Sequence, residues 1–232
     1  MTATVVLVHG AWHGAWSWQP VTRRLRSKRI DVVALDLPGH GDSTEPLGDL
    51  EADIAAVTAT LDEVDGPVVL VGHSLGGAVI TGAGRHDAVI ELAYVAAFAP
   101  DEGETVFGLA EQFPNDFSEP PFDGADDGTV TLTEYGLHHV LYHDASTAVD
   151  TATNLVVPEN GAKFSTEAGL PAWRFCRSTY VRCTEDRIVL PELQTFMAER
   201  AGSRIFDLGC GHMPQFAHPD ELTTILTELA RG

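Results

Sequence analysis

Short, continuously apolar runs alternate along the chain with longer segments whose apolar positions recur at helical spacing. Continuous rather than alternating apolarity is typical of strands that are covered on both faces in a parallel sheet. The runs lie at residues 5–8, 32–35, 68–71, 92–98, 179–183 and 204–208, and the helical segments at residues 16–28, 50–64, 75–85, 191–201 and 219–230. This order predicts an α/β fold with a doubly wound, mostly parallel sheet of about six strands.

The alternation is interrupted between residues 100 and 172, where glycine, proline and acidic residues are frequent. Residues 114–128 and 158–169 have the composition of loops, no strong strand pattern appears, and residues 133–143 are predicted to be helical. Because a structureless loop of this length is unusual inside a compact domain, the interruption predicts an inserted, partly helical cap over the C-terminal edge of the sheet. The expected domains are an α/β core of residues 1–99 and 173–232 and a cap of residues 100–172.

The length and hydrophobic content of the chain indicate how many domains it forms, and its charge indicates which partners it can bind. With 232 residues and 44% hydrophobic residues, the chain can bury one substantial core, which predicts a single domain with an insertion. Fourteen basic residues stand against 34 acidic ones, which gives a formal net charge of −20. Such a surface repels phosphate backbones and anionic lipids, so we expect neither nucleic acid nor a membrane as a partner.

Cysteine usage and the N-terminus bear on location. Three cysteines, an odd number without Cys-x-x-Cys spacing, argue against both a disulfide framework and a cysteine-rich zinc site. No charged leader precedes the apolar run at residues 5–8, and no apolar stretch approaches the ~20 residues that span a bilayer. We therefore expect a soluble protein of the cytoplasm.

The strongest chemical signal is Gly-His-Ser-Leu-Gly-Gly at residues 72–77, which follows a predicted strand and opens a helical segment. This is a Gly-x-Ser-x-Gly motif in the strand–turn–helix context of a nucleophilic serine. The chemistry requires a sharp turn that lifts the Ser74 hydroxyl above the sheet, where side chains at positions 72 and 76 would collide with their neighbours. We predict Ser74 as the nucleophile and a structural or pocket-wall role for His73; a glycine-rich packing turn is the structural alternative.

A serine hydroxyl becomes a strong nucleophile when a neighbouring base removes its proton, and the base needs a carboxylate that orients it. His212 lies in a turn directly after the last predicted strand, where a loop can return the imidazole to the sheet edge. We predict His212 as the base. For the carboxylate we favour Asp186, which follows the preceding strand, and leave Asp101 and Glu185 as alternatives.

The loop after the first strand, His-Gly-Ala-Trp-His-Gly at residues 9–14, is expected to complete the site. Gly10 lets this backbone approach the substrate, which places the N–H group of Ala11, or alternatively that of Trp12, beside that of Leu75. Two such donors form an oxyanion hole for the developing negative charge.

Further side chains are expected to shape the substrate pocket. Trp12, His13 and Met213 are the predicted substrate contacts, whereas Trp16 and Trp18 are expected to pack the first helix. Apolar residues of the cap could line the pocket or simply pack the cap itself. These residues are Phe107, Leu109, Phe113, Phe117, Phe122, Leu137, Leu141 and Tyr142.

Together these motifs resemble the α/β-hydrolase superfamily, and more narrowly its branch of plant methylesterases, hydroxynitrile lyases and bacterial esterase relatives. The resemblance rests on Val-His-Gly-Ala-Trp-His-Gly-Ala-Trp at 8–16, Ala-Leu-Asp-Leu-Pro-Gly-His-Gly at 34–41, the serine motif at 72–77, Thr-Glu-Asp at 184–186 with Leu-Pro-Glu at 190–192, and Gly-His-Met at 211–213. It implies a triad of Ser74, Asp186 and His212, with the oxyanion hole at Ala11 and Leu75. The lyases of this branch carry threonine where this chain has Gly10 and lysine where it has Met213, so the resemblance favours the esterases.

The sequence therefore predicts an enzyme, a serine esterase that cleaves a small, neutral, largely apolar carboxylic ester through an acyl-enzyme. The predicted cap carries fourteen carboxylates but only Lys163 as a fixed cation, a field that disfavours an anionic substrate. The alternatives are a hydroxynitrile lyase and a ligand-binding protein that keeps the fold but turns over little. No metal or organic cofactor is expected.

Overall fold

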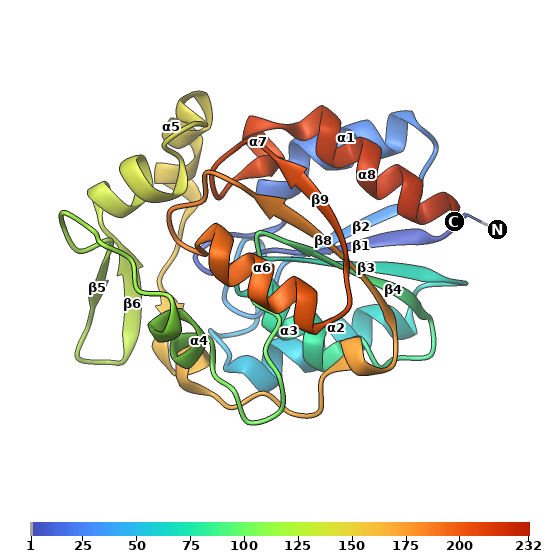
Figure 1. The fold of residues 1–232 in the computed structure, drawn as a ribbon, viewed down its shortest axis with the longest axis horizontal. Helices are drawn as coiled ribbons and strands as arrows, with labels where there is room; N and C mark the ends of the chain where they lie inside the picture. The colour runs from blue at the N-terminus through green and yellow to red at the C-terminus, as the bar shows by residue number, and fades with distance from the viewer. Residues whose placement is uncertain (1) are drawn as a thin grey trace.

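A parallel sheet of six strands forms the centre of the computed structural model, which describes residues 2–232 (Figure 1). The strands lie in the order β2-β1-β3-β4-β8-β9, and every neighbouring pair is parallel, as predicted. Their bounds are β1 Thr4–Val8, β2 Val32–Leu35, β3 Val68–His73, β4 Val89–Val95, β8 Arg177–Cys183 and β9 Arg204–Leu208. The chain leaves β1 toward one edge and resumes in β3 on the other side, so the loops after β1 and β3 diverge at a switch point, where open α/β sheets bind ligands.

Helices cover both faces of this sheet. Val5 and Leu7 of β1 face a cluster that includes residues of α1 and α8, while Val6 and Val8 face a second cluster that includes residues of α2, α3 and α6. Both faces of the strand are therefore buried, which explains its uninterrupted apolar sequence. The helices are α1 Gln19–Ser27, α2 Leu50–Asp62, α3 Gly76–Ala83, α6 Pro191–Arg200 and α8 Pro219–Arg231; a single turn of 3-10 helix, η1 Ala15–Trp18, precedes α1, and a short α7 Pro214–Ala217 precedes α8.

One predicted strand is displaced. The apolar run predicted a strand at residues 92–98, whereas β4 ends at Val95. Ala96 adopts a positive φ of 44°, and the chain then turns beneath the serine motif, where the N–H of Phe98 donates to the carbonyl of Ser74 at 3.1 Å. The end of the run is thus buried in a turn instead of a strand, a difference that apolarity alone does not reveal.

The elements α4, β5, β6 and α5 of the segment of residues 100–172 lie at the left of Figure 1, at the end of the sheet opposite the labelled termini. This segment contains a small antiparallel sheet, β5-β6-β7, in the regions expected to be loops, because strands of two to four residues leave little sequence signal. The predicted helix at 133–143 is present mainly as a π-helix. The elements are α4 Val106–Gln112, β5 Phe122–Gly124, β6 Thr129–Leu132, the π-helix η2 Gly136–Leu141, α5 Ser146–Leu155, β7 Glu159–Asn160 and the 3-10 helix η3 Gly161–Ser165; another, η4 Ala172–Arg174, leads into β8.

A buried ionic cluster joins this segment to the core. The ammonium of Lys163 lies 2.6 Å from a carboxylate oxygen of Asp53 and 2.9 Å from one of Glu159, whose other oxygen lies 3.2 Å from His40 Nε2. Burial raises the pKa of Glu159, but the contacts with His40 and Lys163 outweigh it and lower this pKa to about 2. Burial also raises the pKa of Asp53. This effect outweighs the attraction of the Lys163 ammonium, so the pKa of Asp53 rises to about 6.

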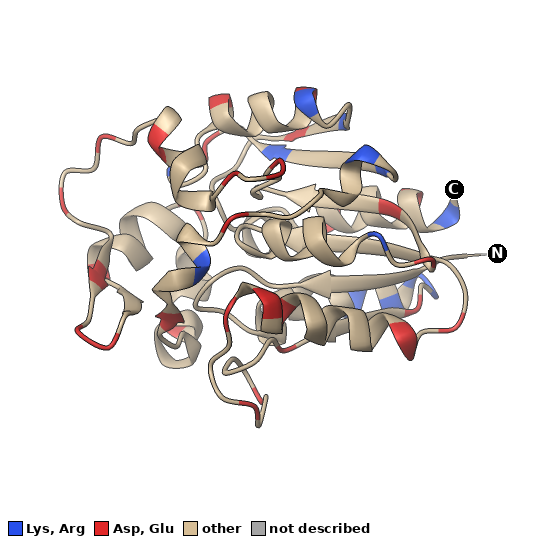
Figure 2. Ribbon diagram, turned by 90° about the horizontal axis from the view of Figure 1, so that it is seen from below, with Lys and Arg blue, Asp and Glu red and all other residues tan. Residues whose placement is uncertain are grey.

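Acidic residues outnumber basic ones over most of the ribbon in Figure 2, in keeping with the net charge of −20. Within residues 2–232, no helix combines the length and apolarity that crossing a membrane requires.

Candidate active site

Ser74 stands on a strained turn between β3 and α3. Its φ of +52° lies in the left-handed region, which non-glycine residues adopt at a cost of about 1–3 kcal/mol and mainly at functional sites. A Cβ at Gly72 would approach the carbonyl oxygen of Gly76 to 2.5 Å, and one at Gly76 would approach that of His9 to 2.5 Å. The two glycines are thus required by backbone contacts on both sides of the serine, as the motif predicts.

A carboxylate and an imidazole meet on the loops that follow β8 and β9. His212 Nδ1 donates to Asp186 Oδ2 at 2.8 Å, and both residues are buried. The other oxygen, Asp186 Oδ1, accepts the N–H groups of Ile188 at 2.8 Å and Val189 at 3.2 Å. Because Nδ1 carries the proton shared with the carboxylate, Nε2 is the nitrogen left to act as a base.

The two alternative acids lie elsewhere. Asp101 forms an ion pair with Arg174 at 2.5 Å. Burial raises the pKa of Asp101, but the contacts with Arg174 and the N–H of Glu102 together outweigh burial and lower this pKa below its ordinary value. Glu185 is exposed on the surface, although it adjoins Asp186 in sequence. Of the three candidates, only Asp186 contacts His212.

His73 connects the turn of Ser74 to the loop that carries His212. Its Nε2 donates to the carbonyl oxygen of His212 at 2.8 Å, and the two imidazole centroids are 4.7 Å apart. Burial lowers the pKa of His73 well below its usual value, so the ring is neutral. Among the described residues, the Ser74 hydroxyl itself makes no hydrogen bond to His212; such contacts often tighten only when substrate binds.

The loop after β1 approaches the serine closely. A Cβ at Gly10 would lie 2.7 Å from the Ser74 Cβ, which leaves no room there for a larger residue without movement of the backbone. Neither Ala11 nor Leu75 donates its N–H in a backbone hydrogen bond outside the regular elements of residues 2–232. Trp12, which follows, has a positive φ of 65°. The N–H groups of Ala11 and Leu75 are those that the sequence predicts for an oxyanion hole.

A cavity of about 500 Å³ opens beside these groups, and Ser74, Leu75, Ala11 and Trp12 line one side of it. The Trp12 indole stacks on the Phe122 ring, with 5.1 Å between the ring centroids, and its N–H donates to the carbonyl of Val130 at 2.8 Å. Most other lining residues are apolar. They include Phe98, Val106, Phe107, Ala110, Phe117, Phe164 and Ile188, while the polar ones besides Ser74 are Glu111, Asn115 and Ser165.

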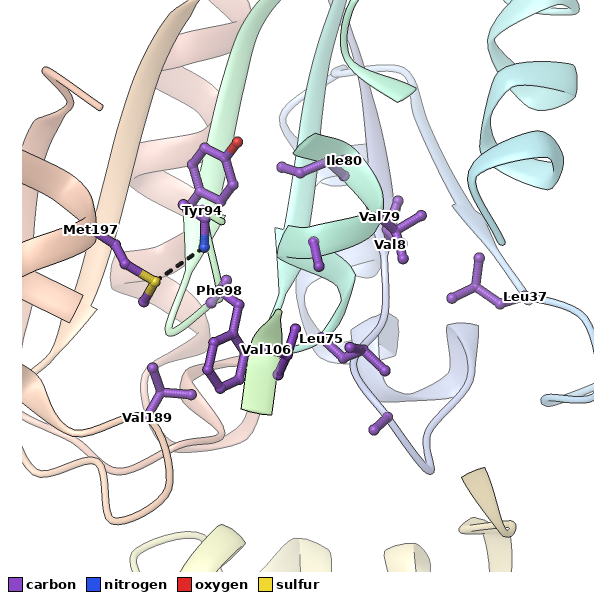
Figure 3. Packing of buried hydrophobic residues seen from close by; sticks show 14 of the residues in the cluster. Val8, Leu37, Leu75, Val79, Ile80, Tyr94, Phe98, Val106, Val189 and Met197 are labelled. Carbon is purple, nitrogen blue, oxygen red and sulfur yellow. Dashed lines mark hydrogen bonds between the residues drawn. The ribbon is translucent and has the colours of Figure 1, made fainter. Parts of the chain in front are cut away.

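Figure 3 shows Leu75, Phe98 and Val106 next to one another beneath α3. All three line the cavity, so the wall around Ser74 is continuous with the hydrophobic core. Of the predicted apolar lining residues of the segment, Phe107, Phe117 and Phe122 line the cavity. Those that pack elsewhere are Leu109, Phe113, Leu137, Leu141 and Tyr142.

Two predicted substrate contacts do not line the cavity. His13 is buried, where its Nδ1 donates to the carbonyl of Ala11 at 2.7 Å and its Nε2 accepts from the Tyr142 hydroxyl at 2.8 Å. Burial lowers the pKa of His13 to about 4 and raises that of Tyr142 well above 10, so both groups stay neutral. Met213 is fully buried in the core, because the chain turns inward into α7 directly after His212.

Gln194 is a residue of the site that sequence reasoning missed. Its side-chain amide donates to Asp186 Oδ2 at 3.1 Å and to the carbonyl of Val189 at 2.6 Å, and its oxygen accepts the N–H of Cys183 at 2.9 Å. It therefore holds both ends of the loop that carries the carboxylate. The available signal is a glutamine between the apolar positions Leu193 and Met197 of α6, on the buried face of that helix.

A doubly wound sheet with a serine on the strained turn at its switch point is the architecture of the α/β hydrolases, and comparison with known proteins agrees. The chain belongs to the alpha/beta hydrolase family, whose sequence model matches residues 5–224. It is 30% identical over 253 residues to methyl jasmonate esterase 1 of Vitis vinifera, covering 98% of this chain and 96% of that protein.

The chain is also 29% identical over 261 residues to salicylic acid-binding protein 2 of Nicotiana tabacum, covering 97% of this chain and 96% of that protein. In fold it is similar to the solved pyrethroid hydrolase of Sphingobium faniae JZ-2, with a TM-score of 0.84, 22% identity and coverage of 100% of this chain and 98% of that one. The resemblance to plant methylesterases and bacterial esterases predicted from the motifs is thus confirmed, and the predicted class, carboxylic ester hydrolase, is in keeping with these relatives.

Proposed function

We propose that this protein hydrolyses small, neutral, largely apolar carboxylic esters through an acyl-enzyme formed on Ser74. The observation that carries the proposal is the position of Ser74, on a strained turn at the wall of an apolar cavity of about 500 Å³. The buried pair of Asp186 and His212 supports it, because His73 ties the backbone of the base loop to the residue before the nucleophile.

In the proposed reaction, Ser74 Oγ attacks the ester carbonyl carbon and His212 Nε2 takes the hydroxyl proton. The N–H groups of Ala11 and Leu75 stabilise the oxyanion, and Asp186 holds the imidazole in the tautomer that leaves Nε2 unprotonated. Collapse of the tetrahedral intermediate breaks the bond to the alcohol, which leaves with the proton from His212. Water then attacks the acyl-enzyme in the same way and releases the acid.

The lining of the cavity supports an apolar, uncharged substrate. No arginine or lysine is among the residues that line it, and Glu111 contributes a carboxylate. Lys163, the one lysine of the segment over the cavity, is engaged by Asp53 and Glu159. An anionic substrate would find no partner for its charge, whereas aromatic side chains can contact an apolar acyl or alcohol group.

The net charge of −20 supports a small neutral molecule, rather than a polyanion or an anionic membrane, as the partner. The odd number of cysteines without paired spacing supports a reducing compartment such as the cytoplasm. We propose the inserted segment 100–172 as a cap, since Phe107, Phe117 and Phe164 from it close the cavity.

The test is turnover of a panel of p-nitrophenyl esters by the wild type and by Ser74→Ala. We expect the variant to lose activity by roughly 10⁶-fold or to fall to the assay background, because no other group forms the acyl-enzyme. Ser178→Ala is the matched control, because Ser178 is 8% exposed and Ser74 is 7% exposed. Ser178 lies near the start of β8, where its hydroxyl forms a hydrogen bond with that of Ser203. Equal turnover by wild type and Ser74→Ala would contradict the mechanism.

A parallel assay for cyanide release from mandelonitrile tests the alternative function, that of a hydroxynitrile lyase. Cyanide release without ester turnover would assign that reaction instead. The crowded position of Gly10, where a Cβ would meet Ser74, and the burial of Met213 both favour the hydrolase.

A further inference from the structure

Three consecutive residues after the π-helix η2 reach the three loops of the candidate active site. The Tyr142 hydroxyl donates to His13 Nε2 at 2.8 Å, in the loop after β1. His143 Nε2 donates to the carbonyl of Glu185 at 3.1 Å, in the loop after β8. Asp144 Oδ2 accepts the N–H of Gly211 at 2.6 Å, in the loop after β9.

Two of these contacts end one residue from a group that the proposed mechanism uses, and the third ends two residues from one. Glu185 precedes Asp186, and Gly211 precedes His212. The contact of Tyr142 continues through the imidazole of His13, whose Nδ1 donates to the carbonyl of Ala11 at 2.7 Å. This last bond holds the backbone of the loop at Ala11, which lines the same cavity as Ser74 and is a donor in the proposed mechanism.

The segment 142–144 is itself held firmly. Leu137, Val140 and Leu141 of η2 are buried in the core, and the N–H of Tyr142 donates to the carbonyl of Leu137 at 3.0 Å. A Cβ at Gly211 would collide with the side chains of both His143 and Asp144, so this loop packs closely against the segment. The segment is thus connected to the core at Tyr142 and to the loop of His212 at His143 and Asp144.

We infer that residues 142–144 are a positioning segment, which aligns the oxyanion loop, the acid loop and the base loop with one another while touching no substrate. The inference rests on the proposed function. Since Tyr142 lies outside the cavity lining, it is expected to affect the rate of the chemical step and to leave substrate binding unchanged.

The first test is Tyr142→Phe, which removes only the hydroxyl. Loss of a whole oxyanion-hole donor costs about 10²–10³-fold in kcat, so a loosened donor is expected to cost about tenfold, with KM within about twofold of wild type. The second-order rate at which a p-nitrophenyl phosphonate labels Ser74 is expected to fall in parallel, because that reaction needs the same oxyanion donors.

Tyr135→Phe is the matched control. Tyr135 begins the same helical region, and its hydroxyl bonds only Ser118 at 3.1 Å, on the surface of the inserted segment. It is expected to match the wild type in both kcat and labelling rate. If Tyr142→Phe also matches the wild type in both, or if it raises KM while kcat stays constant, the inference is wrong.

Asp144 gives an independent arm with a conservative rescue. Asp144→Ala removes the acceptor for the Gly211 N–H and is expected to lower kcat about tenfold, whereas Asp144→Asn keeps an acceptor oxygen and is expected to retain most of the rate. An equal loss in both variants would attribute the effect to charge and overturn the positioning role of this contact. An inactive wild type that no phosphonate labels would overturn the proposed function, and an active wild type matched by all variants would overturn this inference alone.

Discussion

At the scale of single residues, the candidate acid shows how local environment separates chemically equal groups. Asp186, Asp101 and Glu185 all follow strands of the sheet, but only Asp186 is buried against an imidazole and held by two backbone N–H groups. Asp101 is committed to Arg174 at 2.5 Å. A carboxylate whose acceptor sites are all occupied in one geometry is suited to orienting a base.

Exchange of Asp186 for asparagine is expected to lower kcat by about 10³–10⁴-fold. The amide would favour the wrong tautomer of His212 and would not stabilise the imidazolium that forms during the reaction. Steady-state kinetics on a neutral p-nitrophenyl ester measure the effect. Asp101→Asn serves as the control and is expected to stay within about threefold of wild type. A larger loss in Asp101→Asn than in Asp186→Asn would assign the role of the acid to Asp101, in the segment after β4.

At the scale of elements, the inserted segment depends on the ionic cluster as well as on apolar packing. Lys163 is completely buried, and its ammonium bridges Asp53 of α2 and Glu159 of β7. Removing one partner of a buried ion pair leaves the others without compensation, which typically costs 3–5 kcal/mol. We therefore predict that the cluster contributes to the stability with which the segment packs on the core.

Lys163→Met is expected to reduce the free energy of unfolding by about 3–5 kcal/mol, as measured by urea denaturation. The chain offers a matched control, since Lys28, its only other lysine, is exposed at the end of α1. Lys28→Met is expected to change the stability by no more than about 0.5 kcal/mol. Similar values for the two variants would show that the cluster contributes little to stability.

The same cluster predicts a pH dependence. The pKa of Glu159 is lowered from 4.5 to about 2 in the folded protein, so its contribution to stability is complete above pH 4.5 and is lost as the pH falls toward 2. A shift of this size corresponds to roughly 3 kcal/mol. The stability difference between wild type and Glu159→Gln is thus expected to be largest near pH 6 and to shrink below pH 4.5.

Asp53 acts in the opposite direction. Its folded pKa of about 6 exceeds the ordinary 3.8, so it favours the folded state below pH 3.8 and loses that contribution as the pH rises through 6. Urea denaturation of Asp53→Asn over the same pH range separates the contribution of Asp53 to stability from that of Glu159. A stability gap between wild type and Glu159→Gln that stays constant from pH 6 to pH 3 would contradict the role assigned to Glu159.

At the scale of the whole molecule, net charge acts on substrate choice. The field of a chain with charge −20 opposes the approach of an anion to a cavity that no lysine or arginine lines. The effect is strongest at low ionic strength, where the Debye length is about 30 Å at 0.01 M, and weak near 0.15 M, where it is about 8 Å.

We therefore expect kcat/KM for an anionic ester, a p-nitrophenyl hemisuccinate, to rise several-fold between 0.01 M and 0.15 M salt, while that for neutral p-nitrophenyl butyrate stays constant. Glu111→Gln, which neutralises the carboxylate of the cavity, is expected to reduce the salt dependence for the anion. Equal salt responses of the two esters would exclude electrostatic selection at this site.

The sequence by itself determined the features that are encoded locally. Apolar runs at strand spacing predicted all six parallel strands, and the serine motif predicted the turn of Ser74, because periodicity and glycine geometry depend on neighbouring residues. The predicted end of the fourth strand was wrong, because a turn can be as apolar as a strand. The strands β5, β6 and β7 were not predicted, because very short strands are stabilised by pairing with distant partners.

Tertiary structure alone decided how distant side chains meet. It selected Asp186 as the partner of His212, buried His13 and Met213 away from the cavity, and brought Gln194 and residues 142–144 to the loops of the site. These contacts join residues that lie between 8 and 129 positions apart in the sequence. Such distances carry no signal in local periodicity, so the outcome depends on how the segments pack once the sheet has formed.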